Sequence, residues 1–91
     1  MPNKKTIKVT IRDTQNIIFN DDVDRISSFN EVGRFDIYPM HANFISIIRQ
    51  EINLFQDKKL VKNIKIEQAV LKVKQDIADI FLGIETLFIE G

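Results

Sequence analysis

A two-residue alternation of apolar and polar side chains is the feature that most limits the fold of this chain. Residues 7–12 read Ile-Lys-Val-Thr-Ile-Arg. Successive side chains of a β-strand point to opposite faces, so this segment is predicted to be a strand with one buried face. Residues 78–84 alternate in the same way and predict the last strand.

Polar segments separate the apolar ones and predict turns, because short polar side chains hydrogen-bond their own backbone. These turns are expected at residues 13–16, 20–22, 56–59 and 74–76. Further strands are expected at residues 17–19, 35–38, 44–48, 51–55, 60–66 and 69–73. The spacing predicts an all-β fold of eight to ten short strands in a flattened sandwich or barrel. We expect residues 1–91 to form this single domain, with no structure assigned to a tail at about 86–91.

Three local features refine this prediction. Val23 and Ile26 are three residues apart, which predicts a β-bulge near residues 24–25 that keeps both side chains in the core. Gly33 is expected to adopt a special φ in a loop. A helix over residues 64–82 is the alternative, although its β-branched residues favour strands.

Composition excludes several classes of function. Lys plus Arg and Asp plus Glu number 13 each, without the basic excess of a nucleic-acid binder. Cysteine is absent, and no apolar run approaches the roughly 20 residues that span a bilayer. Three glycines provide no phosphate-binding loop. We therefore expect no nucleic acid, no metal, no cofactor and no direct membrane insertion.

Candidate catalytic groups are few. His41 is the only histidine, and a lone histidine beside a proline turn is more often a structural or interface residue than a base or metal ligand. Asp21, Asp22 and Asp24 lack the further oxygen ligands and the glycine of a calcium loop. The serines are not in a nucleophile elbow. The sequence therefore predicts a binding protein rather than an enzyme.

Residues 33–42 read Gly-Arg-Phe-Asp-Ile-Tyr-Pro-Met-His-Ala. This segment resembles the signature G-x-x-G-[IV]-[LY]-P-x-H-A-P of the epsilon subunit of bacterial ATP synthases, with four residues at matching positions: Tyr38, Pro39, His41 and Ala42. The resemblance extends over about residues 5–85, including a strand at residues 69–73 that is similar to the family's G-x-L-x-V segment. Asp36 stands where the family usually has glycine, and Asn43 where it usually has proline.

The resemblance implies a non-catalytic subunit of the central stalk. Such a subunit binds the gamma subunit, sits on the c-ring as a further candidate partner, and reaches the alpha and beta subunits only indirectly. It implies a cytoplasmic location, peripheral to the membrane through the ATPase complex. By position, the residues facing gamma would be Asp13, Tyr38, Met40, His41 and Ser46. The ring-facing loop would carry Asn30, Glu31 and Arg34, for which an ordinary solvated loop is the other interpretation.

Two alternatives remain open at this stage. Family members usually continue into a helical hairpin, and this sequence ends at Gly91, so either it is a shortened piece or the subunit lacks the hairpin. Such a subunit could serve an F-type-like ATPase adapted to motility, without a proton ring. Outside the family, the alternative is an unrelated β-sandwich that binds peptides or carbohydrates.

Overall fold

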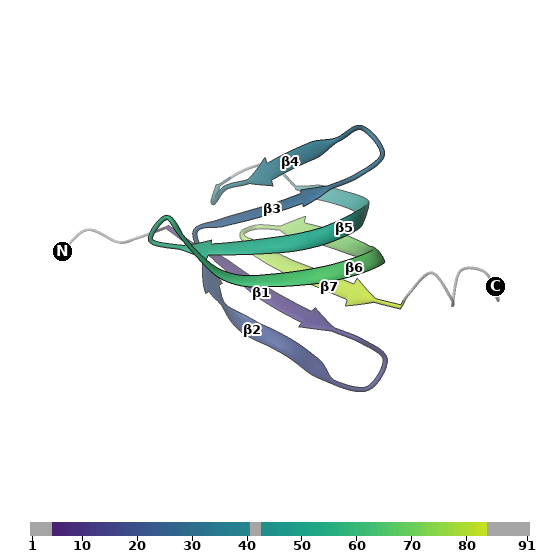
Figure 1. The fold of residues 1–91 in the computed structure, drawn as a ribbon. Helices are drawn as coiled ribbons and strands as arrows, with labels where there is room; N and C mark the ends of the chain where they lie inside the picture. The colour runs from purple at the N-terminus through teal and green to yellow at the C-terminus, as the bar shows by residue number, and fades with distance from the viewer. Residues whose placement is uncertain (1–4, 41–42, 84–91) are drawn as a thin grey trace.

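The computed structural model describes residues 5–40 and 43–83, and all regular structure in these ranges is β (Figure 1). The seven strands are β1 (Ile7–Arg12), β2 (Ile17–Val23), β3 (Arg25–Phe29), β4 (Arg34–Ile37), β5 (Phe44–Gln56), β6 (Lys59–Lys74) and β7 (Ile77–Leu82). They form one sheet in the order β2-β1-β7-β6-β5-β3-β4. The pair β1–β7 is parallel, and the other pairs are antiparallel. The all-β prediction is confirmed, but the described residues form seven strands where eight to ten were expected.

The sheet folds into two layers because β5 and β6 are long and bend together. Residues 44–49 of β5 pair with residues 68–73 of β6, and residues 50–56 pair with residues 59–66. We call β2, β1, β7 and the first of these paired segments the first layer, and β3, β4 and the second paired segment the second layer. At the bend the register shifts between Arg49 and Gln50, and Gln50 has a φ of 75°.

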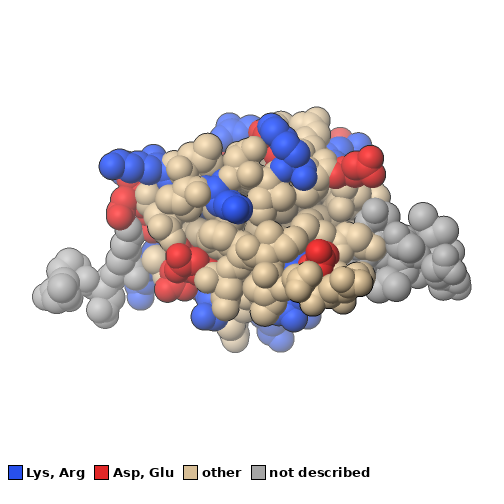
Figure 2. Space-filling view, turned by 60° about the horizontal axis from the view of Figure 1, so that its bottom comes forward, with Lys and Arg blue, Asp and Glu red and all other residues tan. Residues whose placement is uncertain are grey.

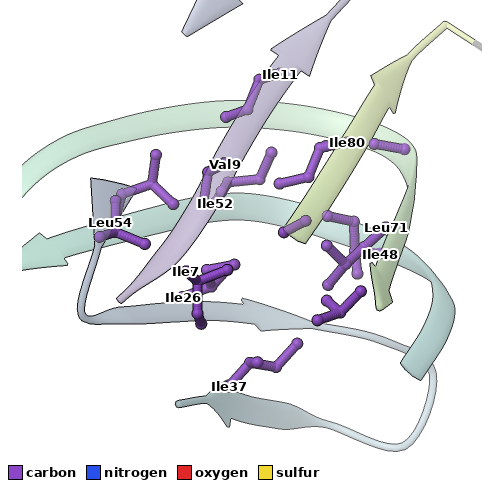
Figure 3. Close-up of a cluster of buried hydrophobic side chains, with 14 residues drawn as sticks. Ile7, Val9, Ile11, Ile26, Ile37, Ile48, Ile52, Leu54, Leu71 and Ile80 are labelled. Carbon is purple, nitrogen blue, oxygen red and sulfur yellow. The ribbon is translucent and has the colours of Figure 1, made fainter. Parts of the chain in front are cut away.

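The core lies between the two layers and is rich in isoleucine (Figure 3). The inward positions predicted from the alternation of β1 are fully buried, as is Ile80 in β7. Burial of each such side chain contributes about 1.5–3 kcal/mol. The buried hydrophobic residues are Ile7, Val9, Ile11, Val23, Ile26, Ile37, Ile48, Ile52, Leu54, Ala69, Leu71, Val73, Ala78 and Ile80.

Two predictions about strand boundaries are wrong. The separate strands expected at residues 44–48 and 51–55, and at 60–66 and 69–73, are continuous as β5 and β6. The ladder survives the bend because bulges absorb the change of register. Continuous strands also replace the helix considered for residues 64–82.

The turn expected at residues 20–22 is also absent, since these residues belong to β2. Asp22 lies opposite Lys8 in the ladder, and the backbone oxygen of Asp22 accepts a hydrogen bond from Gln56 Nε2 at 2.5 Å. Polar side chains are tolerated there because β2 is an exposed edge strand. Composition alone could not distinguish this edge strand from a turn.

The bulge expected near residues 24–25 is instead a crossing between layers. β2 ends at Val23 against β1, whereas β3 begins at Arg25 against Phe55 of β5. Asp24 lies between them and donates its backbone N–H to the Phe55 carbonyl at 2.7 Å. Val23 and Ile26 are both fully buried, as predicted, but they belong to different strands.

The remaining turns agree with the sequence. Gly33 has a φ of 141°, and the loop before it separates β3 from β4. Asp57 and Lys58 connect β5 to β6 with φ values of 52° and 67°. The turn at Gln75 and Asp76 connects β6 to β7 in a similar way.

Candidate partner-binding surfaces

The strand directions divide the sequence-predicted site residues between two ends of the sandwich. One end carries the β1–β2 turn with Asp13 and the β3–β4 loop with Asn30 and Glu31 (Figure 1). The other end carries Tyr38 and Met40, which follow β4. The residues assigned to gamma therefore do not form one continuous patch in the described part of the chain. His41 lies outside the described residues.

Tyr38 and Met40 line an open groove of about 810 Å³. Tyr38 is 45% exposed and Met40 is 69% exposed. The backbone N–H of Met40 donates to Asp76 Oδ1 at 2.7 Å, which ties the segment after β4 to the β6–β7 turn. The groove is lined by Lys5, Asp24, Arg25, Tyr38, Pro39, Met40, Phe55, Asp57 and Lys58. A fixed backbone with large exposed apolar side chains suits an interface.

Interactions among strand ends brace another part of the groove lining. The guanidinium of Arg25 lies 3.8 Å from the centre of the Phe55 ring, a close cation–π contact. The carboxylate of Asp24 accepts a hydrogen bond from the backbone N–H of Asp57. These residues come from two separate parts of the sequence, 24–25 and 55–57, so the sequence analysis did not identify them, and no local pattern could have done so.

The β3–β4 loop is held by Asn30. Its side-chain oxygen accepts hydrogen bonds from the backbone N–H groups of Val32 and Gly33, at 2.9 and 3.3 Å. Its Nδ2 donates to Ser46 Oγ at 3.3 Å. Two of the residues expected to face different partners, Asn30 and Ser46, therefore lie side by side. Asn30 acts within the loop, whereas Glu31 and Val32 are exposed.

Arg34 and Asp36 form an exposed pair on β4. Arg34 Nη2 lies 3.4 Å from Asp36 Oδ1, and Arg34 Nε donates to Ser27 Oγ at 3.2 Å. An exposed pair of this kind contributes only about 0.2–1 kcal/mol. The side chain of Arg34 is nevertheless 58% exposed, so its charge stays accessible to a partner.

Asp13 closes the β1–β2 turn. Its Oδ1 accepts hydrogen bonds from the backbone N–H groups of Gln15 and Asn16, at 2.8 and 2.7 Å. Backbone hydrogen bonds from Gln15 and then Asn16 lower the pKa of Asp13, since they favour the charged carboxylate. The turn gives Asp13 a structural role whether or not it contacts a partner.

A polar network that the sequence analysis missed lies on the second layer. Glu51 Oε1 lies 2.5 Å from Lys65 Nζ and accepts a hydrogen bond from Asn63 at 3.1 Å, while Asn53 donates to Glu51 Oε2 at 3.3 Å. The hydrogen bond from Lys65, followed by those from Asn63 and Asn53, lowers the pKa of Glu51 to about 2. The network joins β5 to β6 across the ladder.

Metal-binding clusters and membrane-crossing helices were sought among the described residues. Residues 5–40 and 43–83 contain no group of three His, Cys, Asp or Glu residues placed to hold a metal ion. Over the same ranges no helix has the length and apolar character required to cross a membrane. On the face drawn in Figure 2, basic and acidic residues form small groups between uncharged ones, with no broad surface of one sign.

Comparison with known proteins then identifies the family. The family model described as the ATP synthase delta/epsilon chain, beta-sandwich domain, matches residues 6–82. The chain belongs to the ATP synthase delta/epsilon family. This match confirms the resemblance seen in residues 33–42 and rejects the alternative of an unrelated sandwich. A search of curated proteins finds no match.

Chains in two solved ATP synthase structures share the fold. A chain of the Euglena gracilis mitochondrial ATP synthase, in a structure of its OSCP, F1 and c-ring, superposes with a TM-score of 0.77 at 14% identity; the match covers 90% of this chain and 53% of that one. A chain in a structure of the central stalk and c-ring of the Tetrahymena thermophila mitochondrial ATP synthase superposes with a TM-score of 0.69 at 14% identity. That match covers 88% of this chain and 65% of the other. This delta/epsilon sequence thus spans less than two thirds of either chain.

Proposed function

We propose that this delta/epsilon domain is a non-catalytic central-stalk subunit of a rotary ATPase, held to the complex through a gamma-type subunit. The family match over residues 6–82 is the observation that carries the proposal. Two folded layers with a shared core make a stiff body, as transmission of torque requires. The protein would work beside the membrane without entering it, bound through its complex.

The groove at Tyr38 and Met40 supports a specific role in holding gamma. Interface centres are enriched in tyrosine and methionine, and such anchors carry most of the binding energy. Tyr38 also belongs to the segment that resembles the family signature. The β3–β4 loop, at the other end, is the candidate contact for a c-ring through Glu31 and Arg34. One body with contacts at both ends could connect the stalk to a ring.

The test of this role is a binding titration against the purified gamma-type subunit from the same source. Tyr38→Ala removes a large anchor and should weaken binding about tenfold or more, in the range of an interface hot spot. Arg34→Ala removes an exposed charge at the other end and should change binding by less than about fivefold. Isothermal titration calorimetry measures both variants against the unmodified chain.

Thermal unfolding of each variant is the control, because the comparison requires both to be folded. Equal effects of the two substitutions would reject Tyr38 as the anchor. No binding of the unmodified chain to gamma would reject the proposed function itself. The alternative function, in an ATPase adapted to motility, differs from this proposal only in the absence of contact with a proton ring. The presence or absence of a c-ring in the purified complex distinguishes the two functions.

A further inference from the structure

The part of β6 that lies in the second layer is a free sheet edge among the described residues. Residues 59–66 of β6 pair with β5 on one side. No described strand pairs with their other side, because β7 pairs with β6 only from Ala69 to Lys74. We call residues 59–66 the lysine edge. Alternate residues of an edge strand point their backbone N–H and C=O groups away from the sheet, so this edge can pair with an added strand.

The lysine edge is regular over a length that suits such pairing. The ladder between β5 and β6 shifts register on either side of residues 62–66, and these residues pair without interruption with residues 50–54. A stretch of this length lies within the usual range for a β-strand. An extended segment could therefore hydrogen-bond along residues 62–66 without crossing an irregularity.

The core side of the lysine edge is apolar. Ile64 pairs with Ile52, which is fully buried, so both side chains lie on the face of the sheet that meets the core. Ile64 and Ile66 pack against the core but are only partly buried. Leu60 is 53% exposed and Val61 is 43% exposed at the start of the same edge. Apolar side chains of an added strand would lie beside these residues and extend the core.

The charge of the lysine edge indicates the chemistry of its partner. Residues 58–66 contain four lysines and no acidic residue. Lys65 pairs with Glu51, and its side chain is still 77% exposed. Lys59 and Lys62 are exposed and form no ion pair with a described residue. Carboxylates on a partner would meet these cationic groups, so the edge favours an acidic segment over a basic one.

The same features disfavour two other occupants. A second copy of the chain, paired edge to edge, would bring the lysines of both copies together, and like charges on neighbouring strands are destabilising. An anionic lipid surface would neutralise the lysines, but it has no row of backbone N–H and C=O groups to pair with an edge strand. Strand addition uses both the backbone groups and the side chains of the edge.

We propose that the lysine edge binds an extended segment of a partner protein in which acidic and apolar residues alternate, and that this segment adds a strand to the second layer. Its backbone pairs with residues 62–66, its apolar side chains lie beside Ile64 and Ile66, and its carboxylates face the lysines. Residues 62–66 do not line the groove at Tyr38, and the proposal does not rest on binding of a gamma-type subunit there.

The test uses the intact chain and two peptides of about eight residues, one with alternating glutamate and isoleucine and one with lysine in place of glutamate. Fluorescence anisotropy measures the affinity, and hydrogen exchange followed by NMR of the labelled chain locates the contact. The glutamate peptide should bind at least about fivefold more tightly, because its carboxylates pair with several lysines. Backbone N–H groups at alternate positions of residues 62–66 should exchange more slowly in its presence.

Methylation of single backbone nitrogens in the glutamate peptide separates strand addition from attraction between charges. The methyl group removes one backbone donor and leaves every side-chain charge in place. Alternate N–H groups of a strand face its neighbour, so methylation at one of two consecutive central residues should weaken binding at least about fivefold. Methylation at the other residue should have little effect, because that N–H faces away from the edge.

Charge reversal provides the matched control on the chain itself. Lys59→Glu combined with Lys62→Glu should reverse the preference between the two peptides, which a general loss of folding would not do. Lys72→Glu combined with Lys74→Glu makes the same change on exposed residues of β6, in the part that pairs with β7. This second pair of substitutions should leave the preference unchanged.

Four results would overturn the proposal. The first is equal affinity for the two peptides. The second is an equal effect of methylation at the two consecutive nitrogens, which would exclude strand pairing. The third is tighter binding to phosphatidylserine vesicles than to the glutamate peptide, which would make the edge a lipid contact. The fourth is faster exchange of residues 62–66 in the free chain, either on dilution, which indicates a second copy as occupant, or after deletion of residues 84–91, which indicates the chain's own C-terminal segment. None of these results bears on binding of gamma at the groove.

Discussion

At the scale of single residues, the clearest stabilising group is the carboxylate of Glu51. Its hydrogen bonds from Lys65, Asn63 and Asn53 stabilise the charged form and lower its pKa from 4.5 to about 2. A carboxyl group whose pKa is lower in the folded state stabilises the fold above its unfolded pKa. That contribution is therefore complete above about pH 4.5 and is lost as the pH falls toward 2.

Glu51→Gln should consequently lower the stability at pH 7 and leave it nearly unchanged near pH 2. Urea denaturation midpoints at several pH values between these limits measure the difference. Glu67→Gln is the matched control, since Glu67 is exposed and the structure gives it no hydrogen bond within the described residues. The stability of Glu51→Gln could instead differ from that of the unmodified chain by the same amount at every pH. That result would show that the network does not act through ionisation of Glu51.

At the scale of elements, the β5–β6 hairpin holds the two layers together, and its two-residue turn is strained. Asp57 and Lys58 have φ values of 52° and 67°, the region in which glycine is favoured and other residues are destabilised. Lys58→Gly should raise the free energy of unfolding by about 1 kcal/mol, measured by urea denaturation. Lys59→Gly, one residue later in β6, should lower it by a similar amount. A loss of stability with Lys58→Gly would contradict this description of the turn.

The sequence predicted the elements better than their connections. The alternation in residues 7–12 identified the buried face of β1, because the two-residue period depends only on the local backbone. The continuity of β5 and β6 could not be predicted, since a strand that bends between layers has the same local pattern as two short strands. Asp21 and Asp22 look like turn residues, and only their pairing with β1 shows that they belong to an edge strand.

At the scale of the whole molecule, the candidate surfaces were only partly predictable. Tyr38 and Met40 were identified from the resemblance to a family signature, and the structure places both in the groove. Arg25 and Phe55, which complete that groove, come from distant strands and become neighbours only through the fold.

The central claim is that this delta/epsilon domain works as part of a rotary ATPase. Gentle co-purification of the tagged chain from its native source, with identification of every accompanying protein, tests that claim most directly. The account predicts recovery of a gamma-type subunit together with alpha and beta subunits, and loss of these proteins with Tyr38→Ala. A preparation in which intact ATPase is present but none of its subunits accompanies the unmodified chain would contradict the account.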